Sequence, residues 1–422
     1  MSIASRTVRN AANRYRRNVL SPYTELLRIP GTLRFSSSGF VARLPLSMLG
    51  LGCILFLTLQ GNSYAVAGAV SAAGALTNAF CAPVLSRYID RYGQHRVLPF
   101  TASFSIAFQT VFIVLVLRDA PMWTWFLTWC LGEMFVANIG SLIRARWAYV
   151  LTESAQIRTA FAFESVVDEI IFIAGPPIAT FIALGVTDYA AIVASMGLLA
   201  VGAFLLVPQR ATEPPRTTVE HHEGGPALLF PGMPIVALVY VLVGIVFGAF
   251  EVGTVAYTRE YGQPEMAGIL LAAYSVGSAV AGLVFGAVHL KMRLPRQFMW
   301  SMIALAIACL PLPFIHSVFL LGFIGLFTGF TVSPVLITGS ALTEELVPSS
   351  RLTEGLSIVG AGIGVGFALG SVVSGIIIDA HGASPAFGVL SVSAVIGALI
   401  VVGARRILDT SFANARAANS TD

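Results

Sequence analysis

Charged residues are scarce in this sequence. Asp, Glu, Lys and Arg make up only 11% of its 422 residues, whereas 56% are hydrophobic and the mean hydropathy is +0.82. A soluble domain of this length needs a polar surface that such a composition does not supply. The shortage of charge therefore excludes a soluble globular protein and indicates a chain embedded in a lipid bilayer.

The sequence also offers little for catalysis or metal binding. Its four cysteines lie singly in separate apolar stretches, without the spacing of metal ligands: Cys53, Cys81, Cys130 and Cys309. HExxH and GxSxG sequences are absent, and no polar stretch is long enough to be a soluble catalytic domain. We therefore expect no enzyme activity, no cofactor, no bound metal and no nucleic-acid partner. A lipid-handling protein or a membrane enzyme is a remote alternative.

What the sequence does contain is a series of apolar blocks long enough to cross a membrane as helices. About 20 residues at roughly 1.5 Å each span about 30 Å of hydrocarbon, and backbone groups in lipid must bond within their own segment. We therefore predict an all-α membrane protein. The twelve transmembrane helices predicted are 38–60, 64–86, 97–117, 122–143, 161–184, 187–207, 233–256, 266–289, 297–316, 318–342, 355–379 and 385–404.

The basic residues predict the orientation of these helices. Lys and Arg are retained on the cytoplasmic side of bacterial membranes, and an even number of spans puts both termini on one side. If that side is the cytoplasm, only Arg118 and Arg259 of the 25 Lys and Arg residues lie outside. Lys291 is the only Lys, which indicates a GC-rich genome and a prokaryotic plasma (inner) membrane. We expect a multi-pass monomer with cytoplasmic termini.

Polar stretches divide the chain into segments. Residues 208–232 are rich in Pro, Gly, Glu and His and are predicted to be a cytoplasmic linker. A basic segment at the start either lies on anionic lipid headgroups or is a disordered tail. The predicted segments are a basic cytoplasmic N-terminal segment (1–37), a six-helix bundle (38–207), the linker (208–232), a second six-helix bundle (233–404) and a cytoplasmic tail (405–422).

The two predicted bundles are related to each other by an internal repeat. A shift of 200 residues aligns the pair Ala67-Gly68 with Ala267-Gly268, and it also aligns Arg96 with Arg296. Internal repeats of this kind are common in secondary transporters. The repeat predicts two pseudo-symmetric bundles.

A polar sequence between the second and third spans resembles the signature of a known family. The signature of the major facilitator superfamily in this loop is GxxxDRxGxR(R/K). The chain matches it at Asp90, Arg91, Gly93 and Arg96, and departs from it at Ser86 and His95. The resemblance implies the fold of that superfamily. It also implies that the motif is a cytoplasmic gate whose partner is the eleventh helix, which begins near Glu354. The alternative is a turn that only sets topology.

A second resemblance lies in the fifth span. Gly175, Pro176 and Pro177 resemble part of the antiporter motif found in efflux members of the superfamily, although Ala179 and Thr180 replace the Gly-Gly pair that should follow. Pro removes a helix hydrogen bond and bends the helix. The resemblance favours export, and an ordinary proline kink is the alternative.

Acidic residues inside the apolar spans carry the most chemical information. Each ionised carboxylate near the bilayer centre costs about 3 kcal/mol on insertion scales. Four such acids are candidates for proton coupling or for the substrate cavity: Glu133, Asp168, Glu169 and Glu251. Arg43, in the first span, is the one cation well inside the predicted spans, and Glu164 is expected to pair with Arg43 or Arg158.

These acids outnumber the cations available to them, so we expect one or more to bind and release protons. Burial away from a cation favours the neutral, protonated carboxyl. Two alternatives are open: the acids attract a cationic substrate, or they bind Na⁺ together with backbone oxygens. Each acid can also be a structural carboxyl that another polar group satisfies.

The sequence as a whole predicts a secondary active transporter that alternates access around a site at the middle of the membrane. It resembles proton-coupled antiporters that export drugs or metabolites, so the expected partners are a small-molecule substrate, protons and the lipid bilayer. A proton that enters down a potential of about 100 mV releases roughly 2.3 kcal/mol. The alternative within transport is a proton- or sodium-coupled symporter that imports a sugar or an organic ion.

Overall fold

The computed structural model describes residues 24–215, 227–287, 292–348 and 351–419. Most of the basic N-terminal segment, part of the linker and Lys291 lie outside the described residues. The described part is helical, which confirms the predicted class. Its α-helices are α2 (Thr32–Arg43), α3 (Pro45–Leu59), α4 (Tyr64–Tyr92), α5 (Gln94–Leu117), α6 (Met122–Met134), α7 (Ile139–Val150), α8 (Ser154–Gly185), α9 (Ala190–Leu206), α10 (Met233–Glu260), α11 (Met266–Ala287), α12 (Leu294–Cys309), α13 (Val318–Leu346), α14 (Leu352–His381), α15 (Ala383–Gly403) and α16 (Arg405–Asn419).

The long apolar helices agree with the predicted spans. In the described residues, eleven helical segments are long and apolar enough to cross a membrane, and α9 is a shorter apolar helix. Two of the eleven combine neighbouring helices, α2 with α3 and α6 with α7. Short 3₁₀ helices in the described part of the chain connect longer elements: η1 (Arg210–Thr212), η2 (Ala227–Leu229) and η3 (Leu312–Phe314).

The fourth predicted span is interrupted. Residues 135–138 leave the helical path between α6 and α7, so carbonyl groups near the break lose their helical partners. The amide of Asn78, from α4, donates to the carbonyls of Glu133 at 3.1 Å and Val136 at 3.0 Å. Asn138 then caps α7, because its Oδ1 accepts a hydrogen bond from the backbone N–H of Ser141 at 3.1 Å. These side chains make a break inside the membrane segment tolerable.

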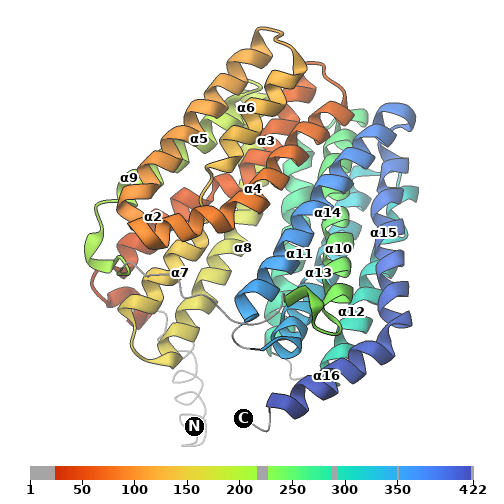
Figure 1. Ribbon diagram of the computed structural model, residues 1–422. Helices are drawn as coiled ribbons and strands as arrows, with labels where there is room; N and C mark the ends of the chain where they lie inside the picture. Colours follow the sequence, from red (N-terminus) through yellow and green to blue (C-terminus); the bar gives the residue numbers. More distant parts are fainter. Residues whose placement is uncertain (1–23, 216–226, 288–291, 349–350, 420–422) are drawn as a thin grey trace, which may run out of the picture.

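The helices form two halves that lie side by side (Figure 1). Helices α2–α9 make up the half on the left of the figure, and α10–α15 make up the half on the right. Helix α4 of the first half packs along α14 of the second. At one end of the molecule, α4 ends and α14 begins. We call it the linker end, because η1 follows α9 and η2 precedes α10 there. The other end is called the opposite end.

Close contacts between the halves lie toward the opposite end. A Cβ atom at Gly68 of α4 would lie 2.6 Å from the carbonyl oxygen of Ser371 in α14. A Cβ at Gly375 would lie 2.5 Å from the carbonyl oxygen of Tyr64. Such backbone contact between helices requires residues without side chains. The two halves are therefore joined tightly at this end.

Candidate functional site

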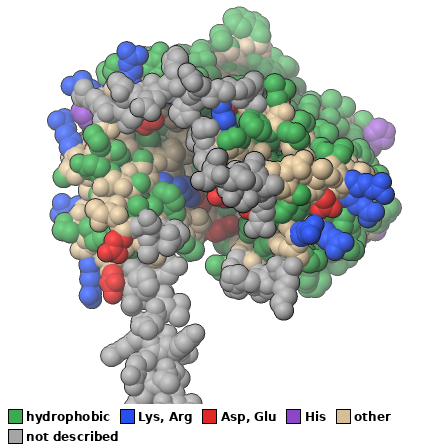
Figure 2. Space-filling view, turned by 60° about the horizontal axis from the view of Figure 1, so that its bottom comes forward, with side chains coloured by type: hydrophobic (Ala, Val, Ile, Leu, Met, Phe, Trp, Pro, Cys, Tyr) green, Lys and Arg blue, Asp and Glu red, His purple; other side chains and the backbone are tan. Residues whose placement is uncertain are grey.

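Figure 2 views the molecule with its linker end brought forward and shows a hollow between the two halves. Acidic and basic side chains are visible in the walls of this hollow. The halves thus join at the opposite end and separate toward the linker end.

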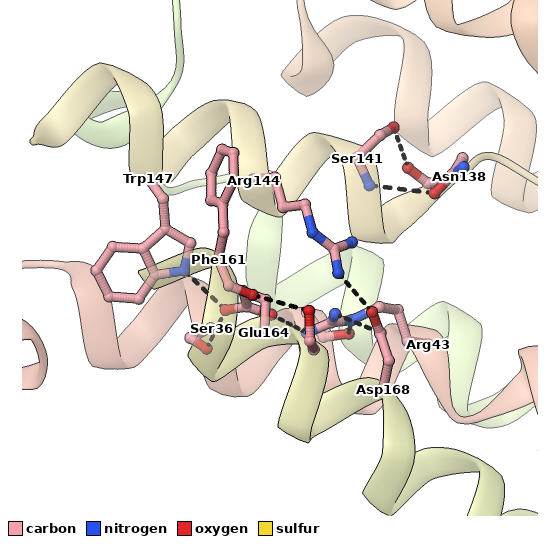
Figure 3. A network of polar contacts seen from close by, with 11 residues as sticks. Ser36, Arg43, Asn138, Ser141, Arg144, Trp147, Phe161, Glu164 and Asp168 are labelled. Atoms are coloured by element: carbon pink, nitrogen blue, oxygen red, sulfur yellow. Dashed lines mark hydrogen bonds and ion pairs between the residues drawn. The ribbon is translucent and has the colours of Figure 1, made fainter. Parts of the chain in front are cut away.

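A network of charged residues lies within the first half. Glu164 of α8 is fully buried and forms an ion pair with Arg43 of α2. The Oε1 atom of Glu164 also accepts hydrogen bonds from Ser36 at 2.8 Å and from the indole N–H of Trp147 at 2.7 Å. Figure 3 shows these groups converging from α2, α7 and α8. The bonds satisfy a carboxylate that would otherwise be costly in an apolar bundle.

Asp168 connects this network to a second arginine. Its Oδ1 accepts from Arg43 at 2.8 Å and its Oδ2 accepts from Arg144 of α7 at 2.7 Å (Figure 3). The Asp168 and Arg144 side chains remain 27% and 31% exposed. Asp168 therefore has two cation partners, which agrees with the alternative that it is a structural carboxyl satisfied by other groups. The predicted span ended at residue 143, whereas α7 continues to Val150 and carries Arg144 alongside α8.

Glu133 lies in a different environment. It belongs to the last turn of α6, directly before the break, and its carboxylate makes no hydrogen bond or ion pair with the described residues. A Cβ at Gly74 of α4 would lie 2.8 Å from its Cγ. The neighbouring Trp129 is only 1% exposed, and its indole N–H has no acceptor in the described structure. Glu169, beside Asp168, is half-buried and makes no ion pair within the described residues.

Glu251 projects from α10 toward the other half. Its Oε1 atom is buried and has no hydrogen-bond partner in the described part of the chain. A Cβ at Gly50 of α3 would lie 3.9 Å from that oxygen and 3.6 Å from the hydroxyl of Ser71 in α4. The carboxylate of Glu251 therefore lies at the junction between the halves.

The residues of the DRxG motif are found at the linker end. Asp90 and Arg96 are exposed and make no hydrogen bond or ion pair with any described residue. The guanidinium of Arg91 lies 5.4 Å from the centre of the Tyr92 ring. Gly93 separates α4 from α5 with φ of 94°, a left-handed conformation that favours glycine.

Glu354, the expected partner region in α14, is occupied elsewhere. Its carboxylate binds Arg351 at 2.9 Å and accepts from the backbone N–H of Ala227 at 3.0 Å. In this conformation the structure does not bring Asp90 and Glu354 together by a hydrogen bond.

The opposite end contains a contact that sequence reasoning missed. Asp379, near the end of α14, accepts hydrogen bonds from the backbone N–H groups of Tyr64 at 2.9 Å and Ala65 at 2.8 Å. These N–H groups belong to the first turn of α4, so a carboxylate of one half caps a helix of the other. Arg259 adds a second link, because its Nη1 donates to the carbonyl of Thr58 at 2.8 Å. We call the contact of Asp379 with α4 the Asp379 cap.

A sequence signal for this cap exists. The pattern Ile-Asp-x-x-Gly occurs at Ile89 to Gly93, where α4 ends, and again at Ile378 to Gly382, where α14 ends. Gly382 also has positive φ, 88°. Because α4 and α14 run antiparallel, the aspartate at the end of each helix lies near the level at which the other begins.

The Gly175-Pro176-Pro177 sequence also lies at helix contacts. Gly175 packs against the Ser47 side chain of α3, and the Ser47 hydroxyl donates to the carbonyl of Ile171 at 2.8 Å. A Cβ at Gly268 of α11 would lie 2.5 Å from the carbonyl oxygen of Pro176. The motif therefore forms part of the contact between the halves.

The described residues contain no group of three or more His, Cys, Asp or Glu side chains that could hold a metal ion. Three groups of residues are therefore considered for function: the paired network around Asp168, the carboxylates of Glu133, Glu169 and Glu251, and the Asp379 cap.

Comparisons with known proteins agree with the fold. Residues 35–262 and 236–420 match the sequence model of the family described as the Major Facilitator Superfamily. A mutant of the nucleoside transporter NupG is 14% identical, with a TM-score of 0.71 over 88% of this chain and 99% of that one. The POT family transporter PepTSo is 11% identical, with a TM-score of 0.68 over 90% and 99% of the two chains.

A bacterial homologue of the iron transporter ferroportin, in an inward-facing state, is 14% identical with a TM-score of 0.61, covering 92% of this chain and 99% of that one. Likenesses at these identities show the fold alone. No curated protein matches the sequence.

Proposed function

The chain belongs to the major facilitator superfamily, and on that premise we propose that it exports a small drug-like molecule or metabolite by alternating access, in exchange for protons. Membership makes it a multi-pass membrane transporter and not an enzyme. The direction, the coupling ion and the substrate class are the proposal.

The observation that carries the proposal is the asymmetry of the contact between the halves. They meet through glycines at the opposite end, whereas a hollow with charged walls separates them at the linker end. Two rigid halves that rock about a central site would alternate between this arrangement and its converse. The linker end faces the cytoplasm in this proposal, because the basic residues concentrate there.

The Asp379 cap has a defined role in such a cycle. It holds α4 of one half to α14 of the other only while the opposite end is closed. Asp90, at the other end of α4, has no partner while the linker end is open. We assign Asp90 to cap the beginning of α14 when the linker end closes, so that one aspartate bonds in each conformation.

Proton coupling is assigned to the carboxylates without a cation partner. Glu133 and Glu169 make no ion pair within the described residues, and Glu133 directly precedes a break in its helix. A carboxyl in such a setting is stable when neutral and can release its proton when the surroundings become polar. Asp168 has a different role, because its ion pairs with Arg43 and Arg144 hold its carboxylate in place.

Two features of the first half bear on the direction of transport. The Gly175-Pro176-Pro177 sequence resembles an element of exporters, which favours efflux. The Arg144–Asp168 pair favours the second candidate function, import of an organic ion by symport. The guanidinium of Arg144 is partly exposed, and a planar guanidinium can donate two hydrogen bonds to a substrate carboxylate.

The test is substrate-dependent proton flux in proteoliposomes under an imposed pH gradient. Glu133→Gln and Glu169→Gln are compared with Glu153→Gln, a matched control whose exposed side chain precedes α8. We expect flux to collapse in at least one of the two variants and to persist in the control. If both variants retain substrate-dependent proton flux, Glu133 and Glu169 are excluded as proton carriers. If the solute moves in the same direction as the protons, the protein is a symporter.

A further inference from the structure

Buried oxygen atoms gather at the junction of α4, α10 and α14. The oxygens Oε1 of Glu251, Oγ of Ser371 and Oγ of Ser374 are buried and have no hydrogen-bond partner in the described structure. Ser371 and Ser374 are 0% exposed. Ser71, on α4, contributes a further buried hydroxyl. The proposed function gives these three serines no role.

Glycines show that the oxygens border one small region. A Cβ at Gly248, one turn before Glu251 in α10, would lie 2.7 Å from the Ser371 hydroxyl. On the other side, the backbone of α4 reaches Ser371 at Gly68, one turn before Ser71. Residues three apart share a helix face, so Glu251, Ser71 and Ser374 lie on the faces that meet at these glycines. Because α4 runs antiparallel to α14, Ser71 lies on the linker-end side of Ser371, whereas Ser374 lies on its opposite-end side.

The α3 helix closes the junction. The position that a Cβ of Gly50 would occupy lies 3.6 Å from the Ser71 hydroxyl and 3.9 Å from Oε1 of Glu251. The carboxylate of the second half and the hydroxyl of the first half thus border the same space. Because residue 50 is a glycine, no side chain from this position fills the space.

Among the described residues, four buried Ser and Thr hydroxyls have no hydrogen-bond partner: those of Thr180, Thr254, Ser371 and Ser374. Buried hydroxyls in helices commonly donate to the carbonyl four residues earlier, as those of Thr58, Ser195 and Thr258 do. Ser371 and Ser374 do not. Buried polar atoms without partners are costly and call for a ligand or an ordered water.

The chemistry of the oxygens favours a monovalent cation. One carboxylate balances one positive charge, and Glu251 has no ion pair in the described structure. Ca²⁺ takes 6–8 oxygen ligands, often from several carboxylates, and Mg²⁺ prefers to retain its waters. A proton on Glu251 would neutralise the carboxylate and leave the hydroxyl oxygens as they are. Secondary transporters bind their coupling ions near the middle of the membrane.

We propose that Glu251, Ser71 and Ser371 form a binding site for one Na⁺ ion. The site combines α4 of the first half with α10 and α14 of the second, so it is complete only while the opposite end is closed. Bound Na⁺ therefore stabilises the conformation that the Asp379 cap also stabilises. The proposal rests on the proposed function only for the rocking motion; the binding of the ion does not depend on it.

The test is Na⁺ binding to the purified full-length protein in detergent. Radioactive ²²Na⁺ is displaced by NaCl, with KCl and choline chloride at equal ionic strength as comparisons. The variants are Glu251→Gln, Ser71→Ala and Ser371→Ala. Ser195→Ala is the matched control, because this buried serine already donates to the carbonyl of Ala191.

We expect saturable binding to the wild type and loss of binding in Glu251→Gln. Binding should be about tenfold weaker in Ser71→Ala and in Ser371→Ala, since each serine variant loses an oxygen that faces the cation. The control should bind as the wild type does. Size-exclusion profiles identify a variant that fails to fold, and Ser71→Ala and Ser371→Ala test the site independently from the two halves.

Absence of saturable Na⁺ binding to the wild type would overturn the site, as would equal binding by Glu251→Gln. If Glu251 binds and releases a proton as the pH changes but binds no Na⁺ at any pH, it is a proton site. That result would also overturn the proposal. If the protein shows substrate-dependent proton flux but no Na⁺ binding, the Na⁺ site is excluded and the proposed function stands. If it binds Na⁺ but transports no solute, the proposed function is contradicted and the Na⁺ site stands.

Discussion

Replacement of Asp379 by Ala should open the opposite end of the molecule. The carboxylate accepts from two N–H groups in the first turn of α4, at 2.9 and 2.8 Å, and within the described residues its side chain makes no other hydrogen bond to the first half. Alanine keeps the helix of α14 and removes both bonds. The perturbation therefore acts on the contact between the halves and leaves the interior of each half unchanged.

The expected magnitude follows from the geometry. Loss of an N-terminal cap costs about 1 kcal/mol, and an exposed charge at a helix N-terminus contributes about 0.3–1 kcal/mol. Asp379 is exposed, so solvent screening reduces the sum of these two contributions to about 1 kcal/mol. That energy changes the ratio of the two conformations roughly fivefold. Asp379→Asn keeps one acceptor and should have a smaller effect.

The assay is the distribution of distances between two spin labels at the opposite end. Met122 and Glu265 are exposed, lie in different halves and are replaced by Cys for labelling. Cys81 and Cys130, which are partly accessible, are replaced by Ala. Asp379→Ala should increase the population with a long distance about fivefold in the absence of substrate. An unchanged distribution would refute the reasoning that the cap holds this end closed.

Three further predictions concern other contacts. Asp90→Asn should favour the conformation described here and slow the cycle without changing which solutes are transported; an altered substrate profile would contradict its role at the gate. Arg43→Ala leaves the buried carboxylate of Glu164 without its cation and should destabilise the fold by about 3–5 kcal/mol, seen as a lower thermal midpoint than that of the exposed control Arg28→Ala; equal midpoints would contradict the importance of this pair. Gly68→Ala places a Cβ 2.6 Å from a backbone oxygen of α14 and should shift the same spin-label distances outward; an unchanged distribution would show that the helices adjust locally.

Hydropathy was sufficient to predict the spanning helices, because a membrane demands long apolar segments with internal hydrogen bonds. It was insufficient within the fourth span. The helix carries Arg144 close to the bilayer region, and a charged residue there looks like the end of a span when only composition is considered. The break before Asn138 was equally hidden, because the carbonyls freed by it are satisfied by Asn78 from another helix.

The sequence could not predict which charged residues of the site pair with each other, because the partners lie far apart in the chain. The sequence showed that acids outnumber cations, but only the structure shows which acids have partners. Arg144 and Arg43 both bind Asp168, whereas Glu133 has no such neighbour among the described residues. The Asp379 cap was missed for a related reason. An aspartate at the end of a span is unremarkable by itself, and its meaning depends on the antiparallel packing of α4 against α14.

The central claim of the account is that solute leaves as protons enter. Its most direct test is to load proteoliposomes with labelled solutes and to record solute movement and internal pH together, with the protein in a known orientation. For a transported solute, the account predicts that movement away from the linker end is accompanied by protons moving toward that end, and that an imposed pH gradient drives the solute uphill. Solute movement that is indifferent to the pH gradient, or that runs in the same direction as the protons, would contradict it.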